Sequence, residues 1–128
     1  MAIARSTGAL LGTDEATLSA SIPNNSSLAG SEVDVLGDNA SVGDMWLYAV
    51  ITSTVTAGSI DITINNRRVS GQAYARTSVS RSIAPLNLTQ KVPLGKVAAS
   101  RYMNASVTNN GTGAACTVSI LYEMEKLS

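Results

Sequence analysis

The sequence contains no histidine and no phenylalanine, and it contains a single cysteine, Cys116. Without histidine, the chain lacks the Ser-His-Asp and Cys-His groups of common hydrolases and any histidine-based metal centre. One cysteine can form neither an internal disulfide nor a thiolate zinc site. No glycine-rich phosphate-binding loop is present either. The sequence therefore predicts a protein that is not an enzyme, with no catalytic residues, no cofactor and no bound metal.

Long hydrophobic runs are also missing. No stretch approaches the roughly 20 apolar residues that a membrane helix needs. The first residues, MAIARSTG, lack the apolar core of a signal peptide. We therefore expect no membrane partner and synthesis in a cytoplasm.

Aromatic residues make up only 4% of the chain and charged residues 14%, whereas 45% of the residues are hydrophobic. The apolar residues are mostly Ala, Val, Ile and Leu, and much of the remainder is Ser, Thr, Asn and Gly. Branched side chains favour strands, and Ser, Asn and Gly favour turns. A chain of 128 residues suits one domain, whose core would consist of many small contacts.

Apolar and polar residues alternate in several stretches, as they do in half-buried strands. In the most apolar run, 45–55, one face consists of four apolar side chains: Met45, Leu47, Ala49 and Ile51. The other face begins with Trp46 and Tyr48, so this strand should be covered on both sides, by the domain or by another subunit. Further strand-like stretches are 17–22, 32–35, 59–64 and 90–97. Pro93 restricts the last of these to a sheet edge or a kinked strand.

The segment 101–124 has the strongest strand pattern. Two strand-like runs, 101–108 and 115–124, flank Asn110 and Gly111, and Asn-Gly favours the tight turn of a β-hairpin. We therefore predict that the two runs pair with each other. No helical period and no fixed repeat appear. About eight short strands with frequent turns predict an all-β, antiparallel two-sheet sandwich that is jelly-roll-like.

Residues 1–16 have no clear strand period, because Gly8 and Gly12 interrupt the apolar patch around Leu10 and Leu11. We expect either an arm that packs on a neighbour or a disordered start. The predicted organisation is thus an N-terminal arm, 1–16, followed by a β-sandwich domain, 17–128.

The formal net charge is zero, but the sign of the charge changes along the chain. Residues 1–61 include one basic and seven acidic residues, whereas residues 62–122 include seven basic residues and no acidic one. Either strands of the two halves interleave and neutralise each other, or an acidic and a basic surface meet complementary subunits. Because few aromatic residues accompany the basic ones, nucleic acid is not an expected partner.

Carboxylate pairs deserve a test, because a glycosidase needs only two. Asp34 with Asp38, or Asp38 with Asp44, could also contribute to a calcium site. Their spacing matches no calcium-binding loop, and aspartate in a stretch rich in Gly, Asn and Ser is typical of solvated turns.

One segment resembles a known family. The run 89–96 (TQKVPLGK), followed by 98–102 and 106–113, is similar to small proteins encoded among tailed-phage head genes, which decorate or cement the capsid. The resemblance covers roughly residues 45–124 and is one of pattern. It implies a jelly-roll body, often a homotrimer, on the outer surface of the virion. It also implies contacts with the major capsid protein, in which a terminal arm often takes part.

We therefore predict a structural virion protein that cements a tailed-phage capsid through contacts with major capsid subunits and with its own copies. The candidate interface residues are apolar, aromatic or basic: Leu10, Leu11, Trp46, Tyr48, Arg67, Arg68, Arg76 and Arg81. The alternative is a phage tail or fibre domain, or a β-sandwich module that binds a carbohydrate or a receptor. All aromatic residues except Tyr74 lie in strand-like runs, where core packing is the usual role, and this disfavours the sugar-binding alternative.

Overall fold

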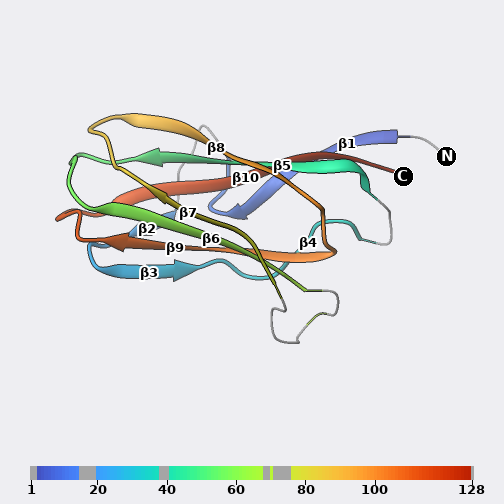
Figure 1. The fold of residues 1–128 in the computed structure, drawn as a ribbon, viewed down its shortest axis with the longest axis horizontal. Helices are drawn as coiled ribbons and strands as arrows, with labels where there is room; N and C mark the ends of the chain where they lie inside the picture. Colours follow the sequence, from blue (N-terminus) through green and yellow to red (C-terminus); the bar gives the residue numbers. More distant parts are fainter. Residues whose placement is uncertain (1–2, 15–19, 38–40, 68–69, 71–75, 128) are drawn as a thin grey trace.

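The structure, a computed structural model, describes residues 3–14, 20–37, 41–67, 70 and 76–127. This part of the chain forms ten strands and no helix, so the all-β prediction is confirmed. Accordingly, no helix long and apolar enough to span a bilayer occurs among these residues. The strands form two antiparallel sheets that lie face to face (Figure 1).

Sheet A consists of five strands: β1 (Ile3–Leu11), β2 (Ala20–Ile22), β5 (Ser41–Thr52), β8 (Thr89–Val97) and β10 (Cys116–Leu127). Their order is β1-β10-β5-β8, and the short β2 continues the edge beside β10. Sheet B consists of the other five: β3 (Ser26–Ala29), β4 (Val33–Asp34), β6 (Ser59–Arg67), β7 (Arg76–Ile83) and β9 (Tyr102–Asn110). Their order is β3-β9-β6-β7, and the short β4 pairs with β9.

This strand order is that of a jelly roll, in which the chain crosses repeatedly between two sheets. In the described part of the chain, β6 and β7 are the only successive strands that pair directly with each other. The predicted two-sheet, jelly-roll-like sandwich is therefore confirmed. Both ends of the chain lie at the same end of the sandwich (Figure 1).

The predicted hairpin of 101–124 is wrong, although both of its strands exist. β9 pairs with β3, β4 and β6 in sheet B, whereas β10 pairs with β1, β2 and β5 in sheet A. A type I′ hairpin turn requires positive φ at both central residues. Gly111 has a φ of 68°, but Asn110 is not among the described residues with positive φ. The turn therefore leads the chain from one sheet to the other.

The core lies between the sheets and has the composition that the alternation predicted. The inward side chains of β5, from Met45 to Ile51, are buried, as are Ile60, Ile62 and Ile64 of β6. Each isoleucine pairs through its backbone with β7 and β9, so β6 is a central strand of sheet B. Burial of a large aliphatic side chain contributes about 1.5–3 kcal/mol.

Residues 3–11 form β1 of the sandwich, so the expected boundary between an arm and the domain does not hold there. β1 pairs with β10 from Ile3 to Leu11, and the register shifts between Ala9 and Leu11. Leu10 and Leu11 are both buried in the core. An irregularity in the strand removes the regular period that makes an edge strand recognisable in a sequence.

Two further strands, β8 and β3, lie at the edges of their sheets. β8 is an edge strand, as Pro93 predicted, and Gly95 adopts a φ of 105° beside the register shift between Leu47 and Tyr48. β3 was not predicted, because Ser26–Ala29 is short and mostly polar or small. The predicted strand in 70–82 corresponds to β7, while residues 71–75 lie outside the described part.

Candidate functional site

Acidic and basic residues that are distant in the sequence form ion pairs within each sheet. Glu32 forms an ion pair with Arg67, and Asp34 lies 3.4 Å from Arg101. At the C-terminal strand, Glu123 pairs with Arg5 of β1. These contacts support local neutralisation between interleaved strands, the simpler of the two alternatives, because acids of one half meet bases of the other.

Of the four arginines in the predicted basic interface, the structure describes the side chains of two, Arg67 and Arg81, and each has a partner within the chain. Arg67 is largely buried with its partner Glu32. Arg81 donates a hydrogen bond to the backbone oxygen of Pro93, 3.3 Å away, and so links β7 to β8. Arg68 and the side chain of Arg76 lie outside the described part. Leu10 and Leu11, the predicted apolar contacts, are buried within the chain and offer no surface to a partner.

Trp46 and Tyr48 do lie together, on the outer face of sheet A. They are two residues apart on β5 and therefore point to the same side. Trp46 remains 49% exposed, whereas Tyr48 is half-buried. The ammonium group of Lys96 lies 4.6 Å from the Trp46 ring centre, and that of Lys91 lies 4.4 Å from the Tyr48 ring centre. Both distances fit cation–π contacts, which hold the rings in place.

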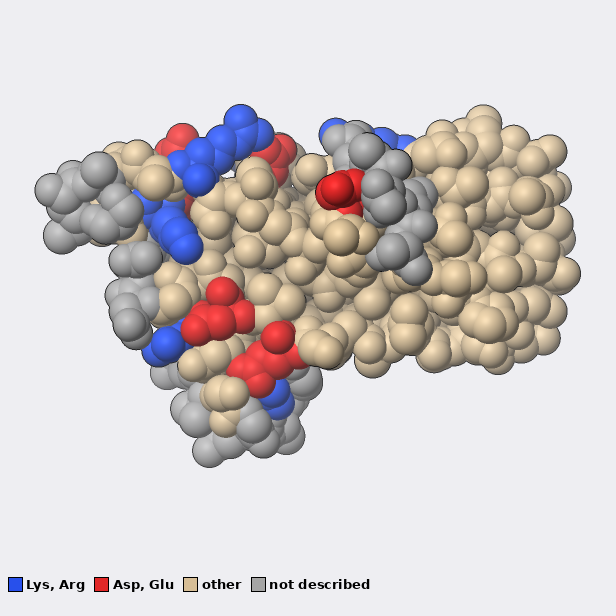
Figure 2. All heavy atoms as spheres, turned by 180° about the vertical axis from the view of Figure 1, so that it is seen from behind, with Lys and Arg blue, Asp and Glu red and all other residues tan. Residues whose placement is uncertain are grey.

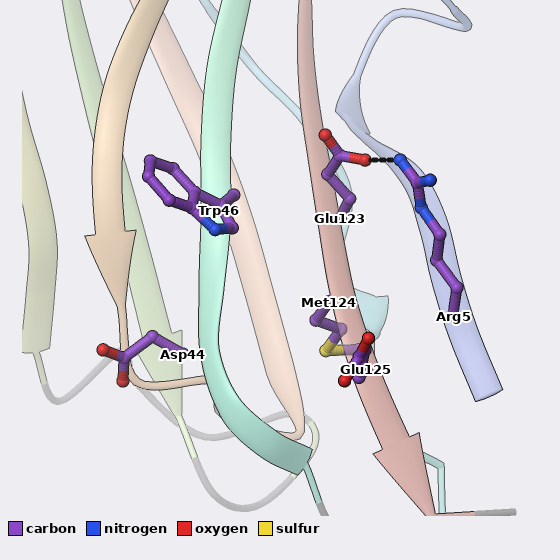
Figure 3. A pocket seen from close by; sticks show the side chains of 6 residues that line it. All are labelled: Arg5, Asp44, Trp46, Glu123, Met124 and Glu125. Atoms are coloured by element: carbon purple, nitrogen blue, oxygen red, sulfur yellow. Dashed lines mark hydrogen bonds and ion pairs between the residues drawn. The ribbon is translucent and has the colours of Figure 1, made fainter. Parts of the chain in front are cut away.

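Two hollows adjoin at Trp46, and together we call them the Trp46 groove. The first, of about 390 Å³, has walls from β1, β5 and β10 and is lined by Arg5, Asp44, Trp46, Glu123, Met124 and Glu125 (Figure 3). The second, of about 400 Å³, extends toward β8 and is lined by Trp46, Leu47, Tyr48, Lys91, Pro93 and Glu123. Both sizes fall in the range of small-ligand sites.

The strand register of sheet A places an aromatic, an acidic and a basic residue side by side on three neighbouring strands around the groove. Trp46 of β5 pairs with Glu123 of β10 on one side and with Lys96 of β8 on the other. Directly opposed residues of neighbouring strands share a face and lie within contact distance. Figure 3 shows Glu123 joined to Arg5 on the far side of β10, while Asp44 lies below Trp46.

Both carboxylate pairs considered from the sequence include Asp38, so the structure describes only one member of each, Asp34 or Asp44. Asp34 accepts a hydrogen bond from the backbone amide of Gly37 at 2.8 Å, a turn contact. Asp38 lies outside the described part, and Asp44 belongs to the Trp46 groove. Among the described residues, no group of three or more His, Cys, Asp or Glu side chains could hold a metal ion.

A second surface, which the sequence did not predict, lies at the end of the sandwich opposite the chain termini. Four loops meet there: 23–25, 53–58, 84–88 and 111–115. None of them contains Asp, Glu, Lys or Arg, and we call this surface the charge-free end. Figure 2 shows it at the right, where no blue or red sphere appears on the visible face. Leu86 and Leu88 are 44% and 52% exposed there.

Hydrogen bonds connect two of the four loops of the charge-free end, 23–25 and 111–115, to each other. The side-chain oxygens of Asn24 and Asn25 each accept a hydrogen bond from a backbone amide of the 111–115 loop, at 2.9 Å. The buried Asn109 donates to the backbone oxygens of Ile22 and Ala114, at 2.9 and 2.8 Å. Because these bonds fix the loops before any partner arrives, less ordering entropy opposes binding.

Among the residues that the structure describes, Cys116 and Tyr122 have side-chain pKa values that clearly depart from the ordinary value. Burial raises the pKa of the Cys116 thiol, although a backbone hydrogen bond partly opposes this. Burial also raises the pKa of the Tyr122 hydroxyl. A buried thiol with a raised pKa is unreactive, and Cys116 belongs to the hydrophobic core as a small apolar residue.

No protein family matches the sequence, and no curated protein matches it. Solved structures do show similarity in fold. One is a mutant VP2 protein of infectious bursal disease virus in derived T=1 particles, with a TM-score of 0.57, 10% identity and 96% of this chain covered. A chain of the Gx strain of the same virus gives a TM-score of 0.59 at 9% identity over 99% of this chain.

A third similar structure is a family two carbohydrate esterase from Cellvibrio japonicus, with a TM-score of 0.51, 16% identity and 98% of this chain covered. The chain spans 36% of that esterase and 31% and 33% of the two viral chains. At these identities the likeness concerns the fold alone. The sandwich of this chain is thus similar to one in a viral particle protein and to one in a carbohydrate-active enzyme.

Proposed function

We propose that the chain is a non-enzymatic structural protein of the virion, which decorates the outer surface of a tailed-phage capsid. The observation that supports this most directly is the charge-free end with its two exposed leucines. Interface centres are depleted in charged residues, and exposed apolar patches mark sites of protein association. Two of its loops, 23–25 and 111–115, are also held together by hydrogen bonds, which lowers the entropy cost of docking.

The choice of a capsid as partner rests on two further points. The sequence pattern of 89–113 resembles capsid decoration proteins of tailed phages. The fold is similar to that of a viral protein that occurs in particles. In this proposal, major capsid subunits are the partners, and contacts with further copies of the chain add to the attachment. Many weak contacts repeated over a lattice give strong attachment through avidity.

Co-sedimentation with capsids that lack this protein tests the proposal. The native chain should bind at a fixed, saturating ratio to the capsid subunit, and binding should change little with salt, because few charges take part. Leu88→Glu would bury an unpaired carboxylate in the contact, which costs about 3 kcal/mol. That corresponds to a roughly hundredfold loss of affinity.

The matched control is Ala98→Glu, which adds the same charge to an exposed loop at the opposite end of the sandwich. This variant should bind like the native chain. Failure of the native chain to bind capsids, or an equal loss of affinity in both variants, would refute attachment through the charge-free end. Light scattering on the isolated chain gives its oligomeric state, which tests the expected homotrimer.

A further inference from the structure

The Trp46 groove is not used by the proposed attachment, because it lies on the flank of the sandwich and not at its charge-free end. A third hollow, of about 210 Å³, lies next to the second, with which it shares Tyr48, and is lined toward β1 by Thr7 and Gly8. Three neighbouring hollows on an open sheet face suit an extended ligand with repeating units better than a single compact molecule.

The charge around Trp46 is balanced. Six charged side chains surround the first two hollows, three basic and three acidic: Arg5, Lys91, Lys96, Asp44, Glu123 and Glu125. An anionic ligand would meet the carboxylates, and a cationic ligand would meet the ammonium and guanidinium groups. Like-charge contacts of this kind disfavour either one. The balance therefore favours a neutral ligand.

The ligand must also match both kinds of wall. Trp46, Tyr48 and Pro93 offer apolar surface, while carboxylates accept hydrogen bonds and the Arg5 guanidinium donates them. A sugar ring combines an apolar C–H face with hydroxyl groups that both donate and accept. We propose that the Trp46 groove binds a neutral oligosaccharide, with a sugar ring stacked on the exposed part of the Trp46 indole.

The sequence disfavoured sugar binding because Trp46 lies in a strand, where core packing is usual. The structure removes that objection, since Trp46 is 49% exposed on the outer face of its sheet. Contacts with Lys96 and Lys91 keep both rings oriented in the free protein. A rigid aromatic platform loses little conformational entropy when a ligand stacks on it.

Nuclear magnetic resonance of the isolated chain provides a direct test, because Trp46 is the only tryptophan and gives a single indole N–H signal. The probes are four neutral hexasaccharides, namely maltohexaose, cellohexaose, xylohexaose and chitohexaose. At least one should shift the indole signal in a saturable way. With backbone amide signals as the probe, since the indole signal is lost with Trp46, Trp46→Ala should weaken that binding by about tenfold or more, and Trp46→Phe should restore part of it.

Leu28→Ala is the matched control, because Leu28 is an exposed apolar residue on the other sheet. This variant should bind the saccharide as tightly as the native chain. The inference fails if none of the four probes shifts the indole signal, if Leu28→Ala weakens binding as much as Trp46→Ala, or if only a charged peptide binds the groove. Because no capsid is present, these outcomes are independent of the attachment experiment.

Discussion

Replacing the buried Asn109 should destabilise the fold far more than replacing its exposed neighbour Asn110. Asn109 is 0% exposed, and its side-chain amide donates to Ile22 and Ala114 across the charge-free end. Its side-chain oxygen accepts a hydrogen bond from the Thr112 hydroxyl at 2.5 Å. Asn109→Ala therefore removes three hydrogen bonds at a site without solvent.

The expected loss in the free energy of unfolding follows from the hydrogen bonds that the Asn109 side chain makes. Each hydrogen bond contributes a net 0.5–1.5 kcal/mol, so three contribute about 3 kcal/mol. The Thr112 hydroxyl also lies 2.8 Å from the Ala114 oxygen and can donate there once Asn109 is gone, which recovers about 1 kcal/mol. The vacated space adds a cavity cost. We expect a loss of about 2–4 kcal/mol in the free energy of unfolding.

Urea denaturation followed by far-ultraviolet circular dichroism measures this loss as a lower midpoint at an unchanged slope. Asn110→Ala is the control and should change the free energy by less than about 0.5 kcal/mol. Equal stability of Asn109→Ala and Asn110→Ala would refute the buried network.

Asn109→Asp separates loss of the donor from loss of volume. At neutral pH a carboxylate would face the oxygens of Ile22 and Ala114, so this variant should be less stable than Asn109→Ala. Because burial beside these oxygens disfavours the charged form, the pKa of this carboxyl would be higher in the folded state than in the unfolded chain. Its stability should therefore recover as pH falls toward about 4, where a protonated carboxyl can donate.

Two other predictions concern the packing of β10. Gly8→Ala would place a Cβ atom 2.6 Å from the Tyr122 hydroxyl oxygen, so the ring or β1 must move. A loss of about 1–3 kcal/mol and faster hydrogen exchange in β1 should follow, and native-like exchange would contradict it. The raised pKa values of Cys116 and Tyr122 mean that the unfolded chain releases these protons first as pH rises. The stability that these two groups contribute should therefore be constant below pH of about 8 and fall above it, and Cys116→Ala should flatten the first part of that fall in denaturation curves.

Much of the fold was predictable because alternation directly records which side chains face the core. The inward residues of β5 and β6 were identified in this way, and Pro93 identified β8 as an edge. The pairing of β9 with β10 was wrong for a physical reason. Asn110-Gly111 permits a turn, but a local signal does not determine whether the next strand enters the same sheet or the opposite one.

The candidate surfaces were less predictable, because each depends on segments that are distant in sequence. Every loop of the charge-free end is visibly uncharged in the sequence, yet only the jelly-roll order brings the four together. Alternation did place Trp46 and Tyr48 on the outer face of β5. Whether another layer covers that face depends on the whole fold, so the exposure of Trp46 required the structure.

The distribution of charge suggests how the two surfaces work together. Contacts at the charge-free end would involve few ions, so attachment there would resist changes in salt concentration. The charged residues that the structure describes lie elsewhere, and those around Trp46 are balanced in sign. Because one surface is at an end and the other on the outer face of sheet A, a lattice bound at the end would leave the groove open. A capsid-bound chain should therefore bind an oligosaccharide with the affinity of the free chain.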